Sequence, residues 1–104
     1  MKAVLVITNV PNREVALNMA QKLIDAHLAA CVNVQAPCTS IYHWQGKTES
    51  TEEFPLLIKT TSTRYTEVEQ MIRELHPYEL PEIISVPIER GLPEYLQWVE
   101  NETR

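Results

Sequence analysis

The sequence predicts an α+β fold in which strands and helices follow one another in the order β-α-β-β-α-β, with a further helix at the C-terminus. Apolar, β-branched runs alternate with segments whose apolar residues recur every three or four positions. A Gln45-Gly46-Lys47 turn divides a long β-forming stretch in the middle of the chain. The length of 104 residues and the 44% hydrophobic content fit one domain over residues 1–104, with a core of its own.

The first half of the chain predicts a strand, a helix and a second strand. Residues 2–8 are mainly apolar and β-branched, which is typical of a buried strand. Asn12 is a good N-cap for a helix that extends to about residue 27. Positions at helical spacing form one stripe of this helix, widened by Leu17 and Ile24: Ala16, Ala20, Leu23 and His27. Residues 29–34 begin the second strand, which continues to Trp44 with a break expected at Pro37.

The middle of the chain predicts a hairpin that is longer than the rest of the sheet. Its return strand runs over residues 48–61, and two strands of about a dozen residues each exceed the usual strand length. Pro55 lacks a donor for the ladder, so we expect it at an edge or a bulge. The overhanging tip carries Ile41, Tyr42 and Trp44, which are unfavourable in water. We therefore expect these side chains to pack on a second copy of the chain, in preference to an isolated monomer with a mobile hairpin.

The second half of the chain predicts a helix, a strand and a last helix. Ser62 or Thr63 is expected to cap a helix whose apolar face consists of Val68, Met71, Ile72 and Leu75. This helix should stop at His76, because the proline that follows excludes the helical conformation there. A strand is expected over residues 82–90, and a short amphipathic helix follows Gly91. The complete order is that of the split βαβ, ferredoxin-like arrangement, with two helices on one face of an antiparallel sheet.

The net charge and the N-terminal sequence argue against a nucleic-acid partner, secretion and insertion into a membrane. A net charge of −5 repels phosphate backbones, so we expect no nucleic-acid partner. The apolar run at the N-terminus is too short for a signal peptide, and nothing approaches the ~20 apolar residues of a membrane span. These features predict a cytoplasmic protein without membrane insertion. Cys31 and Cys38 have no second cysteine at metal-binding spacing, and free thiols are the expected state.

The segment His76-Pro77-Tyr78-Glu79-Leu80-Pro81-Glu82-Ile83 is the richest in chemistry. Its two prolines hold polar and aromatic side chains on a stiff connection. His76 is a candidate metal ligand, which Glu79, Glu82 or a second subunit would have to complete. The alternative is a histidine that only caps the helix or packs at an interface.

Lys59 is a single lysine inside an apolar strand. Burial would disfavour its charged form unless a carboxylate paired with it, and Glu53, Glu82 or Glu89 could do so. A cleft between subunits lined by Lys59, Tyr78 and Glu82 would suit a small anion or metabolite. The alternative is an edge lysine that opposes aggregation. The chain has none of the ordinary catalytic templates, so we expect no enzyme activity.

Five motifs in order resemble the CutA divalent-cation tolerance family over nearly the whole length of the chain. They are Leu28-Ala29-Ala30-Cys31-Val32-Asn33, Ser40-Ile41-Tyr42-His43-Trp44-Gln45-Gly46-Lys47, Leu57-Ile58-Lys59-Thr60-Thr61, the segment over residues 76–83, and Tyr95-Leu96-Gln97-Trp98. The resemblance implies a ferredoxin-like homotrimer shaped like the PII nitrogen regulators, with strands of neighbouring chains joined at their edges. It implies a role in tolerance of copper and other divalent cations. Signalling or anchoring of a membrane protein, and sensing of a small molecule between subunits, are the alternatives.

The resemblance also implies a copper site that this chain only partly retains. In a copper-binding member of the family, a cysteine in the first strand and two adjacent histidines before Pro-Tyr supply the ligands. Here those positions are Thr8 and the pair Leu75-His76. A hydroxyl is a poor ligand for Cu(I) and leucine is none, so His76 is the one residue of the set that is kept.

Overall fold

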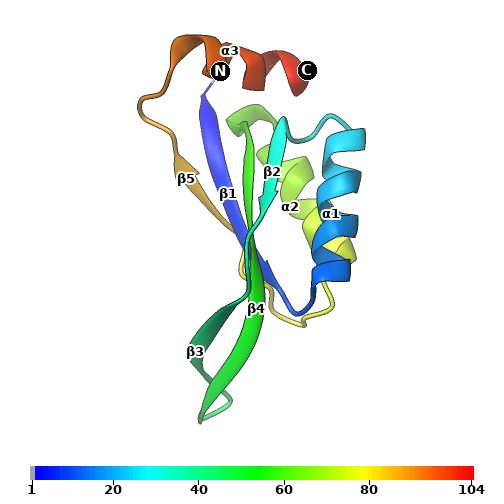
Figure 1. Ribbon diagram of the computed structural model, residues 1–104, viewed down its shortest axis with the longest axis vertical. Coiled ribbons are helices and arrows are strands. Elements are labelled where there is room, and N and C mark those ends of the chain that lie inside the picture. The colour runs from blue at the N-terminus through cyan, green and yellow to red at the C-terminus, as the bar shows by residue number, and fades with distance from the viewer. Residues whose placement is uncertain (1) are drawn as a thin grey trace.

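The structure is a computed structural model that describes residues 2–104, and it confirms the predicted α+β fold (Figure 1). Most predicted elements are present, with some differences at their ends. In chain order they are β1 (Ala3–Val10), α1 (Arg13–Asp25), β2 (Cys31–Val34), β3 (Cys38–Trp44), β4 (Lys47–Thr61), a 3₁₀ turn (Ser62–Arg64), α2 (Tyr65–Leu75), β5 (Ile84–Pro87) and α3 (Pro93–Glu102).

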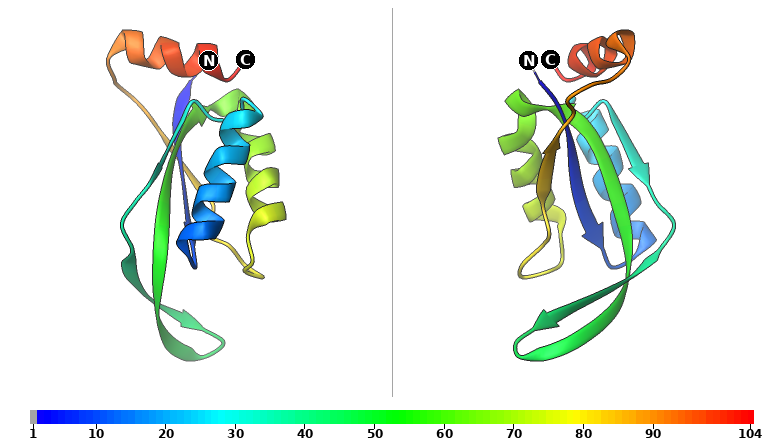
Figure 2. Two further views of the ribbon diagram at one scale, coloured as in Figure 1. Left: turned by 45° about the vertical axis from the view of Figure 1, so that its right-hand side comes forward. Right: turned by 90° about the vertical axis from the view of Figure 1, so that its left-hand side faces the viewer.

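The sheet has the strand order of a ferredoxin-like fold. Its strands lie in the order β2-β4-β1-β5, and every neighbouring pair is antiparallel. Strand β4 lies between β1 and β2, and β1 lies between β4 and β5, so both helical crossovers skip one strand. Helices α1 and α2 cover one face of the sheet, whereas the other face is open along most of its length (Figure 2, right).

The core lies between the helices and the even-numbered residues of the two central strands. On β1 these residues alternate strictly with partly exposed ones, as expected for a sheet with one covered face. Opposite them, α1 contributes Met19 and Leu23 and α2 contributes Val68 and Ile72, all fully buried. The Asn12 side chain accepts a hydrogen bond from the Val15 amide at 2.9 Å, which confirms the predicted cap.

The hairpin of β3 and β4 extends beyond the sheet, as the sequence predicts (Figure 1). Trp44 pairs with Lys47 across a two-residue turn in which Gln45 and Gly46 have φ values of 51° and 78°. Positive φ at both central positions is the geometry that matches the twist of a hairpin. Pro55 lies in a central strand, at the interruption where the partner of β4 changes from β2 to β3. Its missing N–H therefore falls where the ladder is already broken.

Two predicted boundaries differ from the structure. The strand expected over residues 82–90 is only Ile84–Pro87, flanked by Pro81 and ending at a proline, and neither proline can donate to a ladder. Helix α2 is preceded by a 3₁₀ turn and has Arg64 at its N-cap position, where the sequence favoured Ser62 or Thr63.

Helix α3 is fastened across the end of the sheet by polar contacts at its C-terminus. Arg64 Nε donates to the carbonyl of Thr103 at 2.7 Å, and His27 Nδ1 lies 3.2 Å from the carbonyl of Glu102. Val99 of α3 is fully buried. Among the residues that the structure describes, none of the helices has the length and hydrophobicity needed to cross a membrane.

Candidate functional site

His76 ends α2 and is held by both nitrogens of its ring. The residue is extended (φ −79°, ψ 130°), as the following proline requires, and it is 7% exposed. Nε2 lies 2.7 Å from the carbonyl of Asn9, and Nδ1 lies 3.1 Å from the amide of Tyr78. A carbonyl only accepts and an amide N–H only donates, so the imidazole is neutral with its proton on Nε2.

Tyr78 packs its ring against His76 and directs its phenol toward the base of the hairpin. The two ring centroids are 4.7 Å apart with a tilt of 51°. The pKa of Tyr78 is raised to about 12, mainly because the phenol is partly buried. The hydrogen bond with the Glu53 carboxylate and the charge of that carboxylate raise it further, and Tyr42 makes the smallest contribution. Glu53 itself is only 7% exposed. A neutral phenol beside a buried carboxylate is a stabilising arrangement at physiological pH, because the phenol donates and the carboxylate accepts.

Glu82 completes this group from the opposite side of β1. The Asn9 side chain donates to Glu82 Oε1 at 2.9 Å, while the Asn9 backbone carbonyl accepts from His76. Five residues therefore form one connected group, which we call the corner cluster: Asn9, Glu53, His76, Tyr78 and Glu82. They come from β1, from the base of the hairpin and from the connection over residues 76–83 between α2 and β5, and they hold that connection against the sheet.

Lys59 lies apart from the corner cluster within one chain. It is on β4, six residues from Glu53, which at a rise of about 3.3 Å per residue is a separation of roughly 20 Å. Its ammonium donates to the side-chain oxygen of Asn33, an amide, and not to one of the three candidate carboxylates. The structure thus brings His76, Tyr78 and Glu82 together, and Lys59 can meet the other residues of the predicted cleft only across two chains.

The donor set for a metal ion is sparse in this chain. Within residues 2–104, no three side chains of the His, Cys, Asp and Glu types are grouped so as to hold a metal ion. A metal could reach His76 Nδ1 only if the bond from the Tyr78 amide broke. Thr8 is fully buried, its hydroxyl has no hydrogen-bond partner within the described chain, and Leu75 packs against the core. Neither residue fits a soft copper ion.

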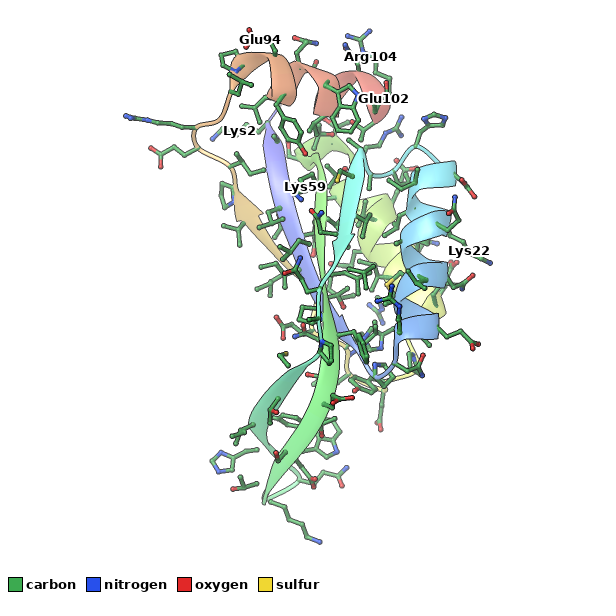
Figure 3. The ribbon with its side chains drawn as sticks, in the orientation of Figure 1. Lys2, Lys22, Lys59, Glu94, Glu102 and Arg104 are labelled. Carbon is green, nitrogen blue, oxygen red and sulfur yellow. The ribbon has the colours of Figure 1, made fainter. Side chains whose placement is uncertain are left out.

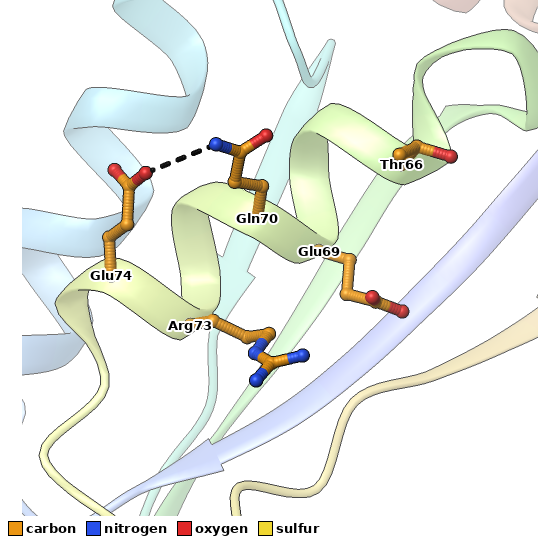
Figure 4. A pocket seen from close by; sticks show the side chains of 5 residues that line it. All are labelled: Thr66, Glu69, Gln70, Arg73 and Glu74. Carbon is orange, nitrogen blue, oxygen red and sulfur yellow. Dashed lines mark hydrogen bonds between the residues drawn. The ribbon is translucent and has the colours of Figure 1, made fainter.

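Two shallow surface hollows lie away from these residues. One, of about 350 Å³, follows the outer side of α2 and is lined by Thr66, Glu69, Gln70, Arg73 and Glu74 (Figure 4). All of these side chains come from one helix, and Gln70 hydrogen-bonds Glu74 at 3.4 Å. The second, of about 340 Å³, lies between α1 and the edge strand β2 and is largely apolar. Neither contains any residue of the corner cluster.

Comparison with known proteins gives the family. The sequence matches the family described as "CutA1 divalent ion tolerance protein" over residues 4–102. The chain belongs to this family. It is 44% identical over 103 residues to the "Divalent-cation tolerance protein CutA" of Thermus thermophilus, with 99% of each sequence covered. It is 49% identical over 89 residues to the "Protein CutA homolog" of Xenopus laevis, covering 86% of this chain but only 59% of that protein.

The fold of the family agrees with the structure described above. The solved "Periplasmic divalent cation tolerance protein CutA" of Archaeoglobus fulgidus superposes with a TM-score of 0.95 at 36% identity, over 98% of this chain and 99% of that one. The names of these CutA relatives describe tolerance proteins. One of them places its protein in the periplasm, so the names do not assign a single compartment to the family.

Two members of the corner cluster were not predicted in their present roles. No role was assigned to Asn9 from the sequence, and Glu53 was considered only as a partner for Lys59. The sequence context of each residue was the available signal. Asn9 comes shortly before Pro11 and Glu53 directly precedes an apolar stretch, and a polar side chain at such a position needs a partner. Glu53 and its partner Tyr78 are 25 positions apart in the sequence, and the two partners of Asn9 are 67 and 73 positions away from it. Local sequence patterns do not bridge such separations.

Proposed function

We propose that this chain acts in the tolerance of divalent cations as a cytoplasmic homotrimer that binds such ions, copper included, weakly. Membership of the CutA1 divalent ion tolerance family supports the role in cation tolerance. The names of the relatives describe no reaction, and a protein without enzyme activity is in keeping with them.

We infer weak binding of cations from the hydrogen bonds that the His76 imidazole already makes. Both ring nitrogens are engaged, so a cation gains the imidazole only at the expense of a hydrogen bond from the backbone. That bond contributes about 0.5–1.5 kcal/mol, which is subtracted from any affinity for metal. His76, Glu79 and Glu82 are not grouped as a metal site within residues 2–104, so Glu79, Glu82 or a ligand from a second subunit would have to move toward the imidazole to complete one. Nitrogen and oxygen ligands of this kind suit a hard or borderline cation better than Cu(I).

Three features of the surface support a homotrimer. The open face of the sheet carries half-exposed Ile84 and Val86, and the hairpin carries Ile41, which is 72% exposed. Strand β2 is an unpaired edge beside an apolar hollow formed with α1. Apolar patches and free edges of this kind are normally covered by another chain. Sedimentation equilibrium should therefore report three times the 12.0 kDa mass of the chain.

Titration of the purified protein with Cu²⁺ and Zn²⁺ tests the site. We expect weak binding that His76→Ala removes and that the matched control His27→Ala leaves unchanged, because His27 is exposed and outside the cluster. A second variant guards against a folding defect: Leu75→His supplies an adjacent imidazole and should tighten copper binding. If neither His76→Ala nor Leu75→His alters the affinity, the proposed ligand is wrong.

A second candidate function is the sensing of a small molecule between subunits, with Lys59 of one chain facing Tyr78 and Glu82 of another. The observation that favours it is the absence of a carboxylate beside Lys59 in the described part of the chain. Ligand-dependent thermal shifts across nucleotides and organic acids would reveal it. A PII-like signalling or anchoring module would instead copurify with a partner protein and show no measurable affinity for metal.

A further inference from the structure

The imidazole of His76 has one atom to offer a cation, Nδ1. Nε2 carries the ring proton and donates to the Asn9 carbonyl at 2.7 Å. Asn9 lies opposite Pro55, which has no N–H, and the pairing of β1 with β5 ends at Ile7. Neither neighbouring strand therefore replaces the imidazole as the donor to this carbonyl. A cation that reaches His76 must use the lone pair of Nδ1.

The lone pair of Nδ1 is already used by the connection over residues 76–83. It accepts a hydrogen bond from the Tyr78 amide at 3.1 Å, and a neutral imidazole has a single lone pair at this nitrogen. A cation on Nδ1 and the Tyr78 amide in its present position therefore exclude one another. Pro77 stands between the two residues, and its fixed φ limits local adjustment of the backbone. The amide can leave Nδ1 only together with the connection.

The carboxylates of the connection need the same displacement. Glu79 and Glu82 are not grouped with His76 as a metal site within residues 2–104. Glu82 is instead held by the Asn9 side chain, which donates to Oε1 at 2.9 Å. The occupied Nδ1 and the separated carboxylates are independent observations. Both indicate that the connection now stands where it excludes a cation.

Tyr78 also attaches this connection to the base of the hairpin. Its ring packs on His76 at a centroid distance of 4.7 Å, and its phenol hydrogen-bonds the Glu53 carboxylate. Glu53 is nearly buried and pairs with Cys38, the first residue of β3, so it belongs to the last pair of the hairpin ladder. A displacement that takes the Tyr78 amide from Nδ1 also draws the phenol from Glu53. The carboxylate then loses a donor, which is unfavourable for a group with little access to water.

We propose that occupation of His76 Nδ1 by a divalent cation and attachment of the hairpin base through Tyr78 and Glu53 are alternatives, so that cation binding loosens the base of the hairpin. The inference rests on the cation binding proposed above and adds the response of the chain to the ion. It requires a second position of the connection, in which Tyr78 has left both His76 and Glu53. Because coupling of this kind is reciprocal, loss of the Tyr78–Glu53 hydrogen bond tightens cation binding.

Calorimetric titration with Zn²⁺, which has no redox chemistry, tests this reciprocity in the full-length protein. Tyr78→Phe keeps the backbone amide and the ring but removes the hydrogen bond with Glu53. Zinc should bind this variant about tenfold more tightly than the parent, as expected when one hydrogen bond to a charged group no longer has to be broken. Tyr42→Phe is the matched control. It removes a phenol that contacts Thr51 at 3.1 Å within the hairpin, leaves the connection intact, and should bind zinc as the parent does.

Amide hydrogen exchange in the same samples reports on the hairpin itself. Saturating zinc should accelerate exchange over residues 49–53 of β4 in the parent, by up to about tenfold, the same coupling factor. In Tyr78→Phe zinc should leave this exchange unchanged, because the base of the hairpin is already released. Glu102→Gln reports adsorption of zinc to a surface carboxylate. Glu102 lies on α3, at the opposite end of the molecule from the hairpin, so this variant should behave as the parent (Figure 3).

The outcomes separate this coupling from the proposed cation binding. Tighter zinc binding by Tyr78→Phe, together with zinc-dependent exchange that the parent alone shows, supports the coupling. The coupling is wrong, and cation binding stands, if the parent binds zinc but Tyr78→Phe binds it no more tightly. It is equally wrong if bound zinc leaves the exchange of the hairpin base unchanged in the parent. If neither protein binds zinc, the proposed function and the coupling are both wrong.

Discussion

Replacement of His76 by alanine tests the role of the imidazole at the centre of the corner cluster. The change removes two hydrogen bonds, to the Asn9 carbonyl at 2.7 Å and from the Tyr78 amide at 3.1 Å. Each contributes about 0.5–1.5 kcal/mol net. The ring contact with Tyr78, at a centroid distance of 4.7 Å, adds about 0.5–1.5 kcal/mol. We therefore expect the free energy of unfolding to fall by about 1.5–4.5 kcal/mol.

The assay is guanidinium denaturation at one fixed protein concentration, because the stability of an oligomer depends on concentration. His27→Ala is the matched control: it removes one exposed contact and should cost less than about 0.5 kcal/mol. His76→Asn retains an acceptor close to the position of Nδ1 and should recover part of the loss. A decrease below about 1 kcal/mol for His76→Ala would refute the view that this residue fastens the connection to the sheet.

Three other predictions concern Tyr78, the hairpin turn and α3. The pKa of Tyr78 is raised to about 12 in the folded state, whereas the unfolded state loses this proton near pH 10. The free energy of unfolding should therefore fall as the pH rises from about 10 to about 12. In Tyr78→Phe, this part of the pH dependence and the tyrosinate absorbance step at the highest pH should both vanish. Gln45→Asn should stabilise the turn by about 0.5 kcal/mol and Gly46→Ala should destabilise it by about 1 kcal/mol, measured by thermal denaturation, since both residues have positive φ. Arg64→Ala frees the Thr103 carbonyl and should accelerate amide exchange in α3, at a cost of about 1 kcal/mol.

Local patterns predicted most of the fold because each element carries its own signal. Asn12 marks the start of α1, Gly46 marks the hairpin turn, and Pro77 forces α2 to end at His76. The boundaries that differ from the prediction depend on contacts between distant segments. Strand β5 is short because it pairs with only four residues of β1, a limit that no local pattern in its own sequence expresses.

The candidate site was only partly predictable for the same reason. The sequence singled out His76, Tyr78 and Glu82, which do lie close together around Asn9. It also placed Lys59 with Tyr78 and Glu82 in a cleft between subunits, and the separation of Lys59 from these two residues within one chain leaves that cleft a prediction about the assembly. The neutral pairing of Lys59 with Asn33 follows from the register between β2 and β4, and register is a property of the folded sheet.

One continuous strand, β4, belongs to both the hairpin and the central sheet. Its first seven residues pair with β3 and its last eight with β1. The projecting part of β4 is therefore continuous with the part inside the sheet. Glu53 is the last residue of the projecting part, and it contacts the Tyr78 phenol. A partner that binds Trp44 at the tip would displace the strand that pairs with it, β4, and this displacement would reach Glu53 through the same strand. The tip and the Glu53–Tyr78 contact, roughly 20 Å apart, are therefore coupled through one strand.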